Sequence, residues 1–436
     1  MYPIWEVPHL TAGLVLALIA TIHILPSHLS TSAMWLNVYL ERKSLKENRP
    51  ELMAFVKRFS KMILIFAYVF GSMTGVGIWF AATTAAPRGI SGLIHNYVWG
   101  WATEWVFFLI EVGGIYVYYY TIDKVDPKTH LKLGWIFALA SWTTMVIIVG
   151  ILTFMLTPGH WAATGNFFDG FFNQTYWPQL LMRTTAMFAI AGAYAVAVAA
   201  GFGDLKARRE IVRTASTWAI AGLALSSLAF LWYRAVLPDA ALANLAALAM
   251  PGLRAVMVWA PALAVAYFAV MAAKPSWARL VPALLAIGLI FSGIFSFERV
   301  RELIRKPFVI PGYMYSNQII AGDLPAKGVQ SELPEIDREG ILHYAPFVPP
   351  DLRDVTDANR LRAGRMVALI ECAACHTFQE TGLRPLPPRI RKLGATGPGD
   401  VAEVLDALGA IPYMPQFAGT DAEKQALAAY LFSISK

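Results

Sequence analysis

The sequence has only two cysteines, Cys372 and Cys375, among its 436 residues. A scaffold held by several disulfides is therefore excluded, as is a zinc site built from two cysteine pairs. Charged residues are also scarce, at 15%, whereas 57% of the residues are hydrophobic. This balance excludes an ordinary soluble protein and is typical of a membrane protein. We therefore interpret the net charge of +7 through membrane topology and expect no nucleic-acid binding.

The start of the chain lacks another common feature, because Met1 to His9 contains neither lysine nor arginine. A secretory signal peptide begins with a positively charged region. We therefore expect no cleaved signal peptide. Internal repeats and low-complexity tracts are absent as well, which argues against a repeat architecture.

Both cysteines lie in one short motif, Cys372-Ala373-Ala374-Cys375-His376. The pattern C-x-x-C-H is the attachment signature of a c-type haem, whose two vinyl groups react with the two thiols. Thiols three residues apart on a helical turn share a face, and the histidine that follows can bind the iron. The alternatives are a redox pair or half of a zinc site. Since a zinc site needs two further ligands nearby, the motif predicts one covalent haem c.

A haem c iron needs a sixth ligand, and the candidate is Met414. It lies in the segment Ile411-Pro412-Tyr413-Met414-Pro415-Gln416-Phe417, between prolines and aromatic residues. Iron bound by histidine and methionine is an electron-transfer centre rather than an open site. The alternative is an ordinary core methionine, since Met fills gaps in apolar cores. Together with the cysteine motif, a Pro/Gly-rich loop and a closing helix, this segment makes residues 357–436 resemble a small class I cytochrome c.

Eight hydrophobic stretches are long enough to cross a bilayer, which takes about 20 residues in a helix. The sequence therefore predicts an all-α protein, in which a polytopic bundle of about eight transmembrane helices is followed by a small all-α periplasmic domain. The predicted spans are 10–39, 59–84, 99–121, 133–157, 179–202, 214–236, 253–273 and 278–300.

The loops between these spans differ in charge. The first, third, fifth and seventh loops are rich in lysine and arginine, as at Arg49, Lys128 and Arg209, whereas the opposite loops hold little more than Arg88 and Arg234. The positive-inside rule places the basic loops in the cytoplasm and the N-terminus outside. Eight spans return the chain to the outer side, where bacteria attach haem c. Both arguments predict a bacterial inner-membrane protein with a periplasmic N-terminus and a periplasmic C-terminal domain.

Residues 301–356 join the last span to the C-terminal domain. Prolines interrupt this segment repeatedly, and its charges are scattered. We interpret it as an ordered, non-helical connector that lies over the outer face of the membrane domain. The predicted division is a haem-binding membrane domain over 1–300, a periplasmic connector over 301–356 and a cytochrome c domain over 357–436.

Ionisable residues within predicted spans are costly and therefore mark candidate functional sites. The alternative interpretations are structural: a hydrogen-bonded packing histidine, a satisfied glutamate pair between helices, and an interfacial cluster of ion pairs. Two glutamates of the third span lie seven positions apart and so share a helical face. In chain order the candidates are His23, His28, Glu104, Glu111, Arg183, Arg254, Glu298, Arg301, Glu302 and Arg305.

From about residue 8 to 310 the chain resembles subunit I of the cytochrome bd oxidases. The stretch from His23 to Leu40-Glu41 is similar to the family's first helix, and Gly71-Ser72-Met73-Thr74-Gly75-Val76 is similar to the glycine motif of its second helix. The run Glu302-Leu303-Ile304-Arg305-Lys306-Pro307-Phe308 resembles its E-x-x-R-x-P-aromatic run. The resemblance implies that His23 and Glu302 bind the iron of a membrane haem.

The run Phe107-Phe108-Leu109-Ile110-Glu111 resembles the family's third helix, which carries two functional glutamates. Glu111 matches the glutamate associated with proton delivery. Glu104 lies one residue away from the other, a haem-ligand candidate. Three arginines, Arg183, Arg254 and Arg305, are candidates for binding haem propionates, since arginine pairs well with carboxylates.

The chain also departs from this family. Arg183 stands where the family has a histidine ligand of its low-spin haem, and a guanidinium has no lone pair to offer iron. Arg254 is followed by Met257 at three positions, where the family spacing is two. The long outer loop that binds quinol is absent, and the haem c domain replaces the family's ninth span. We therefore expect no low-spin haem at position 183 and no quinol oxidation.

These features predict a membrane-bound respiratory electron-transfer protein. Electrons would enter through haem c on His376 and Met414 and continue to one or two non-covalent haems, of type b or d, held by His23 and Glu302. A high-spin haem there could reduce oxygen or, less in keeping with the family, nitric oxide. The expected partners are a second bd-like membrane subunit and a periplasmic cytochrome c or another electron-donor complex. A non-catalytic electron conduit and a simple membrane anchor for haem c are the alternatives.

Overall fold

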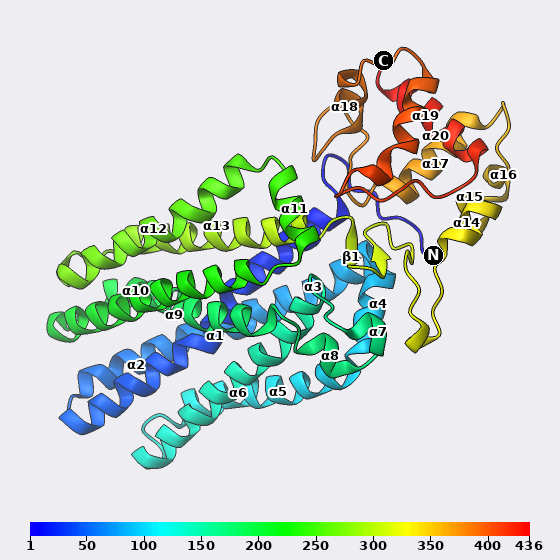
Figure 1. Ribbon diagram of the computed structural model, residues 1–436. Helices are drawn as coiled ribbons and strands as arrows, with labels where there is room; N and C mark the ends of the chain where they lie inside the picture. Colours follow the sequence, from blue (N-terminus) through cyan, green and yellow to red (C-terminus); the bar gives the residue numbers. More distant parts are fainter.

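Long helices form most of the protein in the computed structural model, which describes residues 1–436. They run side by side in an elongated bundle with a smaller helical domain at one end (Figure 1). This architecture confirms the predicted all-α membrane bundle. The long elements are α1 (Ala12–Glu47), the continuous helix α2–η1–α3 (Pro50–Ala85), α5 (Val98–Thr121), α6 (Pro127–Phe154), α9 (Tyr176–Ala200), α10 (Leu205–Ala235), α12 (Pro251–Ala273) and α13 (Leu280–Ile304).

Seven of these helices are long and apolar enough to cross a membrane. The helix outside this set is α5, which contains both Glu104 and Glu111 and packs along α6. The eighth span therefore stays a prediction. Several helices also continue beyond the predicted spans, with α1 reaching Glu47 and α10 starting at Leu205, because their charged ends remain helical outside the apolar layer.

Short helices occupy the connections between the long ones. Side-chain caps define several helix starts: Thr11 accepts a hydrogen bond from the backbone N–H of Leu14, and Asp204 accepts one from Ala207. Such caps satisfy N–H groups that have no partner within the helix. The connecting helices are α4 (Pro87–Asn96), α7 (Trp161–Thr164), α8 (Phe167–Phe171), α11 (Asp239–Ala247) and η2 (Pro275–Trp277).

Helices α9 and α10 form the closest pair in the bundle, and small residues bring them together. A Cβ added at Gly222 would lie 2.4 Å from the carbonyl oxygen of Thr185, and one at Gly192 would lie 2.9 Å from that of Ala215. Glycines at such positions let membrane helices approach backbone to backbone. Helix α1 packs against α3, α6, α9 and α13, so its buried face forms the centre of the bundle.

The segment after α13 is not the non-helical connector that the sequence predicts. It begins with an antiparallel pair of short strands, β1 (Phe308–Ile310) and β2 (Met314–Tyr315). Its second half is helical because apolar residues such as Ile336 and Leu342 pack into the core of the C-terminal domain. The helical elements there are η3 (Pro325–Lys327), α14 (Leu333–Glu339), α15 (Ile341–Tyr344) and α16 (Pro350–Arg353).

The C-terminal domain is built around two crossing helices, its first and its last. Gly364 lies at the crossing, where an added Cβ would be 2.0 Å from the carbonyl oxygen of Ala426 and 2.9 Å from the Cβ of Tyr430. Only glycine allows this approach. The elements of the domain are α17 (Arg360–Cys372), α18 (Leu386–Lys392), α19 (Pro398–Asp406), η4 (Leu408–Ala410) and α20 (Asp421–Ile434).

We expect Gly364→Ala to destabilise the C-terminal domain, because the methyl group forces α17 and α20 apart. Overpacking of this kind costs about 1–3 kcal/mol or more in the free energy of unfolding. The loss is measured by chemical denaturation, with cleavage of the domain by trypsin as the readout of unfolding. The matched control is Gly399→Ala, since Gly399 is also helical but has open space around its Cα. Equal stability of the two variants would contradict the close crossing.

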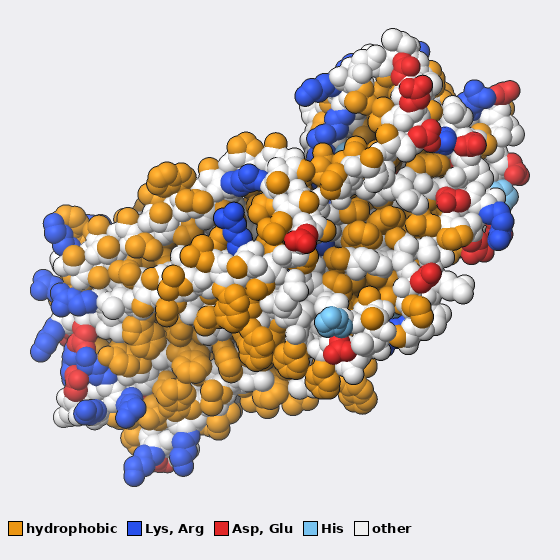
Figure 2. Space-filling view, viewed as in Figure 1, with side chains coloured by type: hydrophobic (Ala, Val, Ile, Leu, Met, Phe, Trp, Pro, Cys, Tyr) orange, Lys and Arg blue, Asp and Glu red, His pale blue; other side chains and the backbone are white.

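The N-terminal segment packs against the C-terminal domain. Met1 and Ile4 contact its hydrophobic core, and Glu6 forms an ion pair with Arg365 at 2.9 Å. The carbonyl oxygen of His9 accepts a hydrogen bond from the N–H of Leu383 at 2.9 Å. Both ends of the chain therefore lie at the same end of the bundle (Figure 1). Lysine and arginine gather at the opposite end, beyond a hydrophobic middle (Figure 2).

Candidate functional site

The predicted haem c attachment motif forms a tight turn at the end of α17. The N–H groups of Cys375 and His376 both donate to the carbonyl oxygen of Cys372, at 3.0 and 2.9 Å. This turn keeps the two thiols close together, and neither forms a disulfide. The local geometry therefore has the two free, neighbouring thiols that thioether attachment requires.

The ring of His376 is held as a metal ligand would be. It is buried, and its Nδ1 donates to the carbonyl oxygen of Arg384 at 2.9 Å. Burial lowers the pKa of His376 to about 4, so the ring is neutral at pH 7. The other nitrogen, Nε2, therefore keeps a lone pair for iron, and the bond from Nδ1 fixes the ring's orientation.

Groups next to this turn complete its surroundings. Burial and the nearby carboxylate of Glu423 raise the pKa of Glu371 to about 8, so Glu371 is mostly uncharged at pH 7. Its Oε2 accepts a hydrogen bond from Asn317 at 3.1 Å, and its Oε1 has no partner. Desolvation alone would raise the pKa of Cys375, but the adjacent cations Lys306 and Arg384 lower it. The turn is therefore a positively charged environment.

The attachment turn lies against the end of the helix bundle. A Cβ built on Gly13, in the first turn of α1, would lie 3.6 Å from the carbonyl oxygen of Ala374. Lys306, just past the end of α13, is close enough to Cys375 to lower the pKa of its thiol. Arg305 is buried beside it, and its Nε and Nη1 have no hydrogen-bond partner. The motif thus faces α1 and α13 directly.

Met414, the predicted sixth ligand, lies in a turn after η4. Its N–H donates to the carbonyl oxygen of Ile411 at 3.0 Å, and its side chain is half-buried. No hydrogen bond joins it to His376. Its role as an iron ligand stays a prediction.

His23 lies in α1, three residues before Pro26, and its ring packs against the glycine motif of α3. Its Nδ1 donates to the carbonyl oxygen of Gly71 at 3.1 Å and lies 3.0 Å from Oγ1 of Thr74. A Cβ on Gly75 would lie 3.3 Å from the ring, so glycine there lets α3 pack directly on the imidazole. The Nε2 atom makes no hydrogen bond, which fits the predicted iron ligand.

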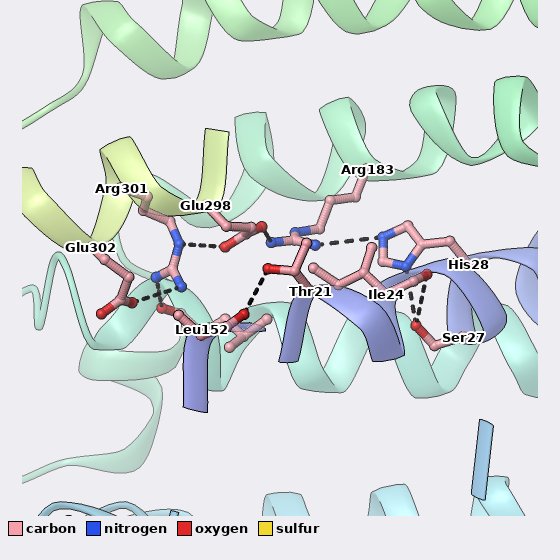
Figure 3. A network of polar contacts seen from close by, with 10 residues as sticks. Thr21, Ile24, Ser27, His28, Leu152, Arg183, Glu298, Arg301 and Glu302 are labelled. Atoms are coloured by element: carbon pink, nitrogen blue, oxygen red, sulfur yellow. Dashed lines mark hydrogen bonds and ion pairs between the residues drawn. The ribbon is translucent and has the colours of Figure 1, made fainter. Parts of the chain in front are cut away.

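A chain of buried charges links α1, α9 and α13 (Figure 3). Arg183 forms an ion pair with Glu298, and its Nη1 lies 3.5 Å from Nε2 of His28. Glu298 also accepts from Arg301 at 2.9 Å. Arg183 was a candidate for a haem propionate, and in this structure its partner is a protein carboxylate. Two guanidinium groups around one buried carboxylate leave Glu298 fully paired.

The same chain continues to Glu302, the predicted ligand of the membrane haem. Its Oε1 accepts from Arg301 at 3.2 Å and its Oε2 from Arg305 at 2.5 Å. Both oxygens are therefore occupied by arginines, as in the ion-pair alternative for this cluster. Iron binding at Glu302 would use a second lone pair of one of these oxygens or replace one of the arginine bonds.

Arg254, the third propionate candidate, lies at the start of α12 on the exposed surface. Its Nη2 donates to the carbonyl oxygens of Leu245 and Leu248, at the end of α11. A cation at a helix C-terminus complements the carbonyl groups that have no partner there. In this structure Arg254 therefore holds α11 against α12.

Glu111 is buried in the middle of the bundle among hydroxyl groups. Its Oε1 accepts hydrogen bonds from Tyr68 and Ser141, both at 2.8 Å, and also from Ser30. These partners come from three different helices, so the tertiary fold builds a polar site around one carboxyl group. A carboxyl group hydrogen-bonded to several hydroxyls can exchange protons with them, which is compatible with the predicted role of Glu111 in proton delivery. Glu104, two turns away on α5, is half-buried and makes no hydrogen bond.

Comparison with known proteins identifies the membrane domain. The family model of the cytochrome bd terminal oxidase subunit I matches residues 12–235, just over half of the chain. The chain belongs to the cytochrome bd terminal oxidase subunit I family. The protein is thus a multi-pass membrane protein of respiratory oxidase type. No curated protein matches the chain in sequence.

A solved structure of the same family agrees in fold. The bd oxidase from Geobacillus thermodenitrificans superimposes with a TM-score of 0.58 at 16% sequence identity, over 73% of this chain and 90% of its own. The bd subunit I family match ends at Ala235, the last residue of α10. The helices that carry Arg254, Glu298 and Glu302, and the whole C-terminal domain, lie beyond it.

The sequence interpretation missed one buried polar cluster, which consists of Glu41, Tyr118 and His130. Glu41 of α1 accepts from the hydroxyl of Tyr118 at 2.6 Å and pairs with Nδ1 of His130 at 2.7 Å. Nε2 of His130 lies 2.9 Å from the carbonyl oxygen of Tyr118. Glu41 was noted only within a family motif, and His130 falls just before a predicted span. Glu41 lies two positions beyond the predicted first span and beside Arg42 and Lys43, so no sequence signal marked it as buried.

Proposed function

We propose that this protein is a respiratory electron-transfer subunit that takes electrons through a covalent haem c and passes them to a non-covalent haem b or d in its membrane domain. Cys372 and Cys375 would bind the haem c, with His376 and Met414 on its iron. His23 and Glu302 would hold the membrane haem. Bound haem would supply the one-electron chemistry.

The observation that carries this proposal is the contact between the C-x-x-C-H turn and the membrane domain. Ala374 lies over Gly13 in the first turn of α1, the helix that also carries His23. The ten residues from Gly13 to His23 correspond to about 15 Å of helix. The turn also lies beside the end of α13, which carries Glu302. Electrons leaving haem c would therefore have a short route within one chain.

Buried atoms without partners support haem binding at this contact. Two side-chain nitrogens of Arg305 and the Nε of Arg384 are buried without a hydrogen-bond partner. Unpaired buried donors are rare because each costs free energy. The carboxylates of a haem propionate are the natural partners of a guanidinium. The neutral ring of His376 fits the iron of haem c, and the free Nε2 of His23 fits the iron of the membrane haem.

The connection between α10 and α12 supports entry of electrons through haem c rather than from quinol. It is occupied by the short helix α11, which packs against α13 and is held by Asn244 through the carbonyl oxygens of Ile304 and Lys306. A long outer loop for quinol is absent there. We infer that electrons enter through haem c of the fused domain, from a periplasmic donor, and not from quinol.

The proposed orientation has both chain ends in the periplasm. The basic residues at the far end of the bundle support it, since lysine and arginine mark the cytoplasmic side. A second membrane subunit is expected, as in other bd oxidases. Exposed apolar residues on α5, among them Trp105 and Leu109, offer an apolar face to such a subunit or to lipid.

A non-catalytic electron conduit is the second candidate. It is favoured by Arg183, which stands at a family ligand position and pairs with Glu298, and by the two arginines that occupy Glu302. With its carboxylate engaged by two arginines, Glu302 would not serve as the ligand of a high-spin iron. In that case the membrane domain would relay electrons without binding oxygen.

Optical spectra of the purified protein separate these functions. We expect a covalent haem c band together with a non-covalent haem whose reduced form binds CO, because a high-spin iron has an open position. A reduced periplasmic cytochrome c should reduce both haems, and quinol should reduce neither. Low-spin haems that ignore CO would establish the conduit, and haem c alone would overturn the membrane-haem proposal.

A further inference from the structure

A basic pocket of about 720 Å³ opens at the end of the bundle that lies away from the C-terminal domain. It is the end where lysine and arginine gather (Figure 2). Five cations surround a single carboxylate in this pocket, which lies between the ends of α1 and α2 and the first turns of α10. Its charged residues are Lys43, Arg49, Lys206, Arg209, Glu210 and Arg213.

Two of these cations already have carboxylate partners. Glu210 pairs with Lys43 at 2.6 Å and with Arg49. Arg49 also contacts Glu51 at 2.7 Å and Glu47 at 3.7 Å, yet its Nη2 is buried without a partner. These pairs fix one wall of the pocket. Arg49 in that wall has one guanidinium nitrogen without a hydrogen-bond partner.

The three cations of α10 form the opposite wall and lack carboxylate partners. Lys206 and Arg209 are exposed and make neither an ion pair nor a side-chain hydrogen bond. Arg213 donates only to the carbonyl oxygen of Ala272, at 3.2 Å. Their spacing of three and four residues puts them on one face of the helix. An unbalanced row of cations of this kind attracts anions.

Below the cations, towards the membrane interior, the pocket borders apolar surface. Tyr39 is one turn deeper than Lys43 on α1, and Trp218 is one turn deeper than Thr214 on α10; their rings lie 5.3 Å apart. Tyrosine and tryptophan favour the level of lipid headgroups. The same face of α10 continues with the exposed residues Ala224 and Leu228.

We propose that this pocket binds the phosphate of an anionic phospholipid at the cytoplasmic surface, with the acyl chains along α10. The cations recognise phosphate, the aromatic pair lies at the depth of the glycerol region, and the apolar face below accepts the chains. Basic pockets between transmembrane helices bind anionic headgroups in this way. A free phosphate compound would use the cations alone and would gain nothing from the apolar surface.

Native mass spectrometry of the intact haem-loaded protein in detergent tests this site by counting bound phosphatidylglycerol or cardiolipin. The test variant is Lys206→Gln/Arg209→Gln/Arg213→Gln, and Arg209→Glu reverses a single exposed charge if the triple variant folds poorly. The matched control is Lys124→Gln/Lys128→Gln/Lys132→Gln, which removes three exposed cations from the turn before α6 and from its first two turns, at the same end of the bundle. We expect the test variant to bind the anionic lipid roughly tenfold or more weakly, with the control unchanged.

A second arm distinguishes the sources of phosphate. Thermal unfolding is measured with added phosphatidylglycerol, with phosphatidylcholine and with inorganic pyrophosphate. A rise in the melting temperature with phosphatidylglycerol only, lost in the test variant, supports the lipid site. An equal rise with pyrophosphate would mean a site for soluble phosphates and would overturn the proposal. Equal lipid binding by the test variant, or equal loss in the control, would overturn it as well.

Discussion

A Cys372→Ser/Cys375→Ser variant is expected to lose all covalently bound haem. Serine hydroxyls do not add to the vinyl groups of haem, so neither thioether bond can form. The membrane domain should still fold and keep its non-covalent haem, because its core is separate from that of the C-terminal domain. Haem staining of a denaturing gel measures the loss, and the reduced spectrum of the membrane fraction measures what remains.

The same variant tests how electrons enter. With haem c absent, a reduced periplasmic donor should no longer reduce the membrane haem, and added quinol should not replace it. Met414→Ala is the control, since it keeps both thioether bonds and His376. We expect that variant to retain the stain while its haem c iron binds added ligands and has a lower midpoint potential. Rapid quinol oxidation by the double serine variant would contradict the proposed entry route.

The second large effect is expected from His23→Ala, which should remove or strongly alter the membrane-haem absorbance and leave haem c intact. The reason is that Nε2 of His23 is the free nitrogen on α1, while Nδ1 is committed to Gly71. Thr74→Val should act in the same direction but more weakly, by about tenfold in haem affinity, because it loosens the ring without removing the ligand. Pyridine haemochrome analysis measures both haem types in the same sample.

His28→Ala is the matched control for this prediction. His28 lies on the same helix, but its Nε2 accepts from Arg183, which keeps its ion pair with Glu298 when the imidazole is removed. We expect that variant to retain the membrane haem. Full haem content in His23→Ala, or equal loss in both variants, would mean that His23 is a packing residue rather than a ligand.

The roles of the arginines show why sequence alone reached only part of this site. Arg183, Arg254 and Arg305 all fitted the same expectation of a propionate partner. The structure separates them: Arg183 pairs with a carboxylate, Arg254 holds the end of α11, and Arg305 keeps two side-chain nitrogens without a partner beside the attachment turn. Glu298 lies 115 positions from Arg183, which no local pattern contains. The partners of Arg254 are only six and nine positions away, but they meet it because α11 folds back onto α12.

Local patterns were sufficient where the physical cause is local. Apolar runs predict membrane helices because the backbone must satisfy its own hydrogen bonds in lipid. The C-x-x-C-H motif predicts haem attachment because two thiols and an imidazole need one helical turn, and the turn at Cys372 is present. The connector was misjudged because its prolines suggested irregular chain, whereas burial of Ile336 and Leu342 in another domain made it helical.

The sequence by itself thus determined the helical membrane class and the family motifs, and it predicted which residues bind haem. Only the tertiary structure decided which groups surround these residues. It places hydroxyl groups around Glu111 and pairs Glu41 with His130. It also packs the Cys372–His376 turn against α1 and α13. Hydrophobicity and motif spacing are properties of contiguous residues. Ion pairs and packing between helices arise only when the fold brings together side chains that are far apart in the chain.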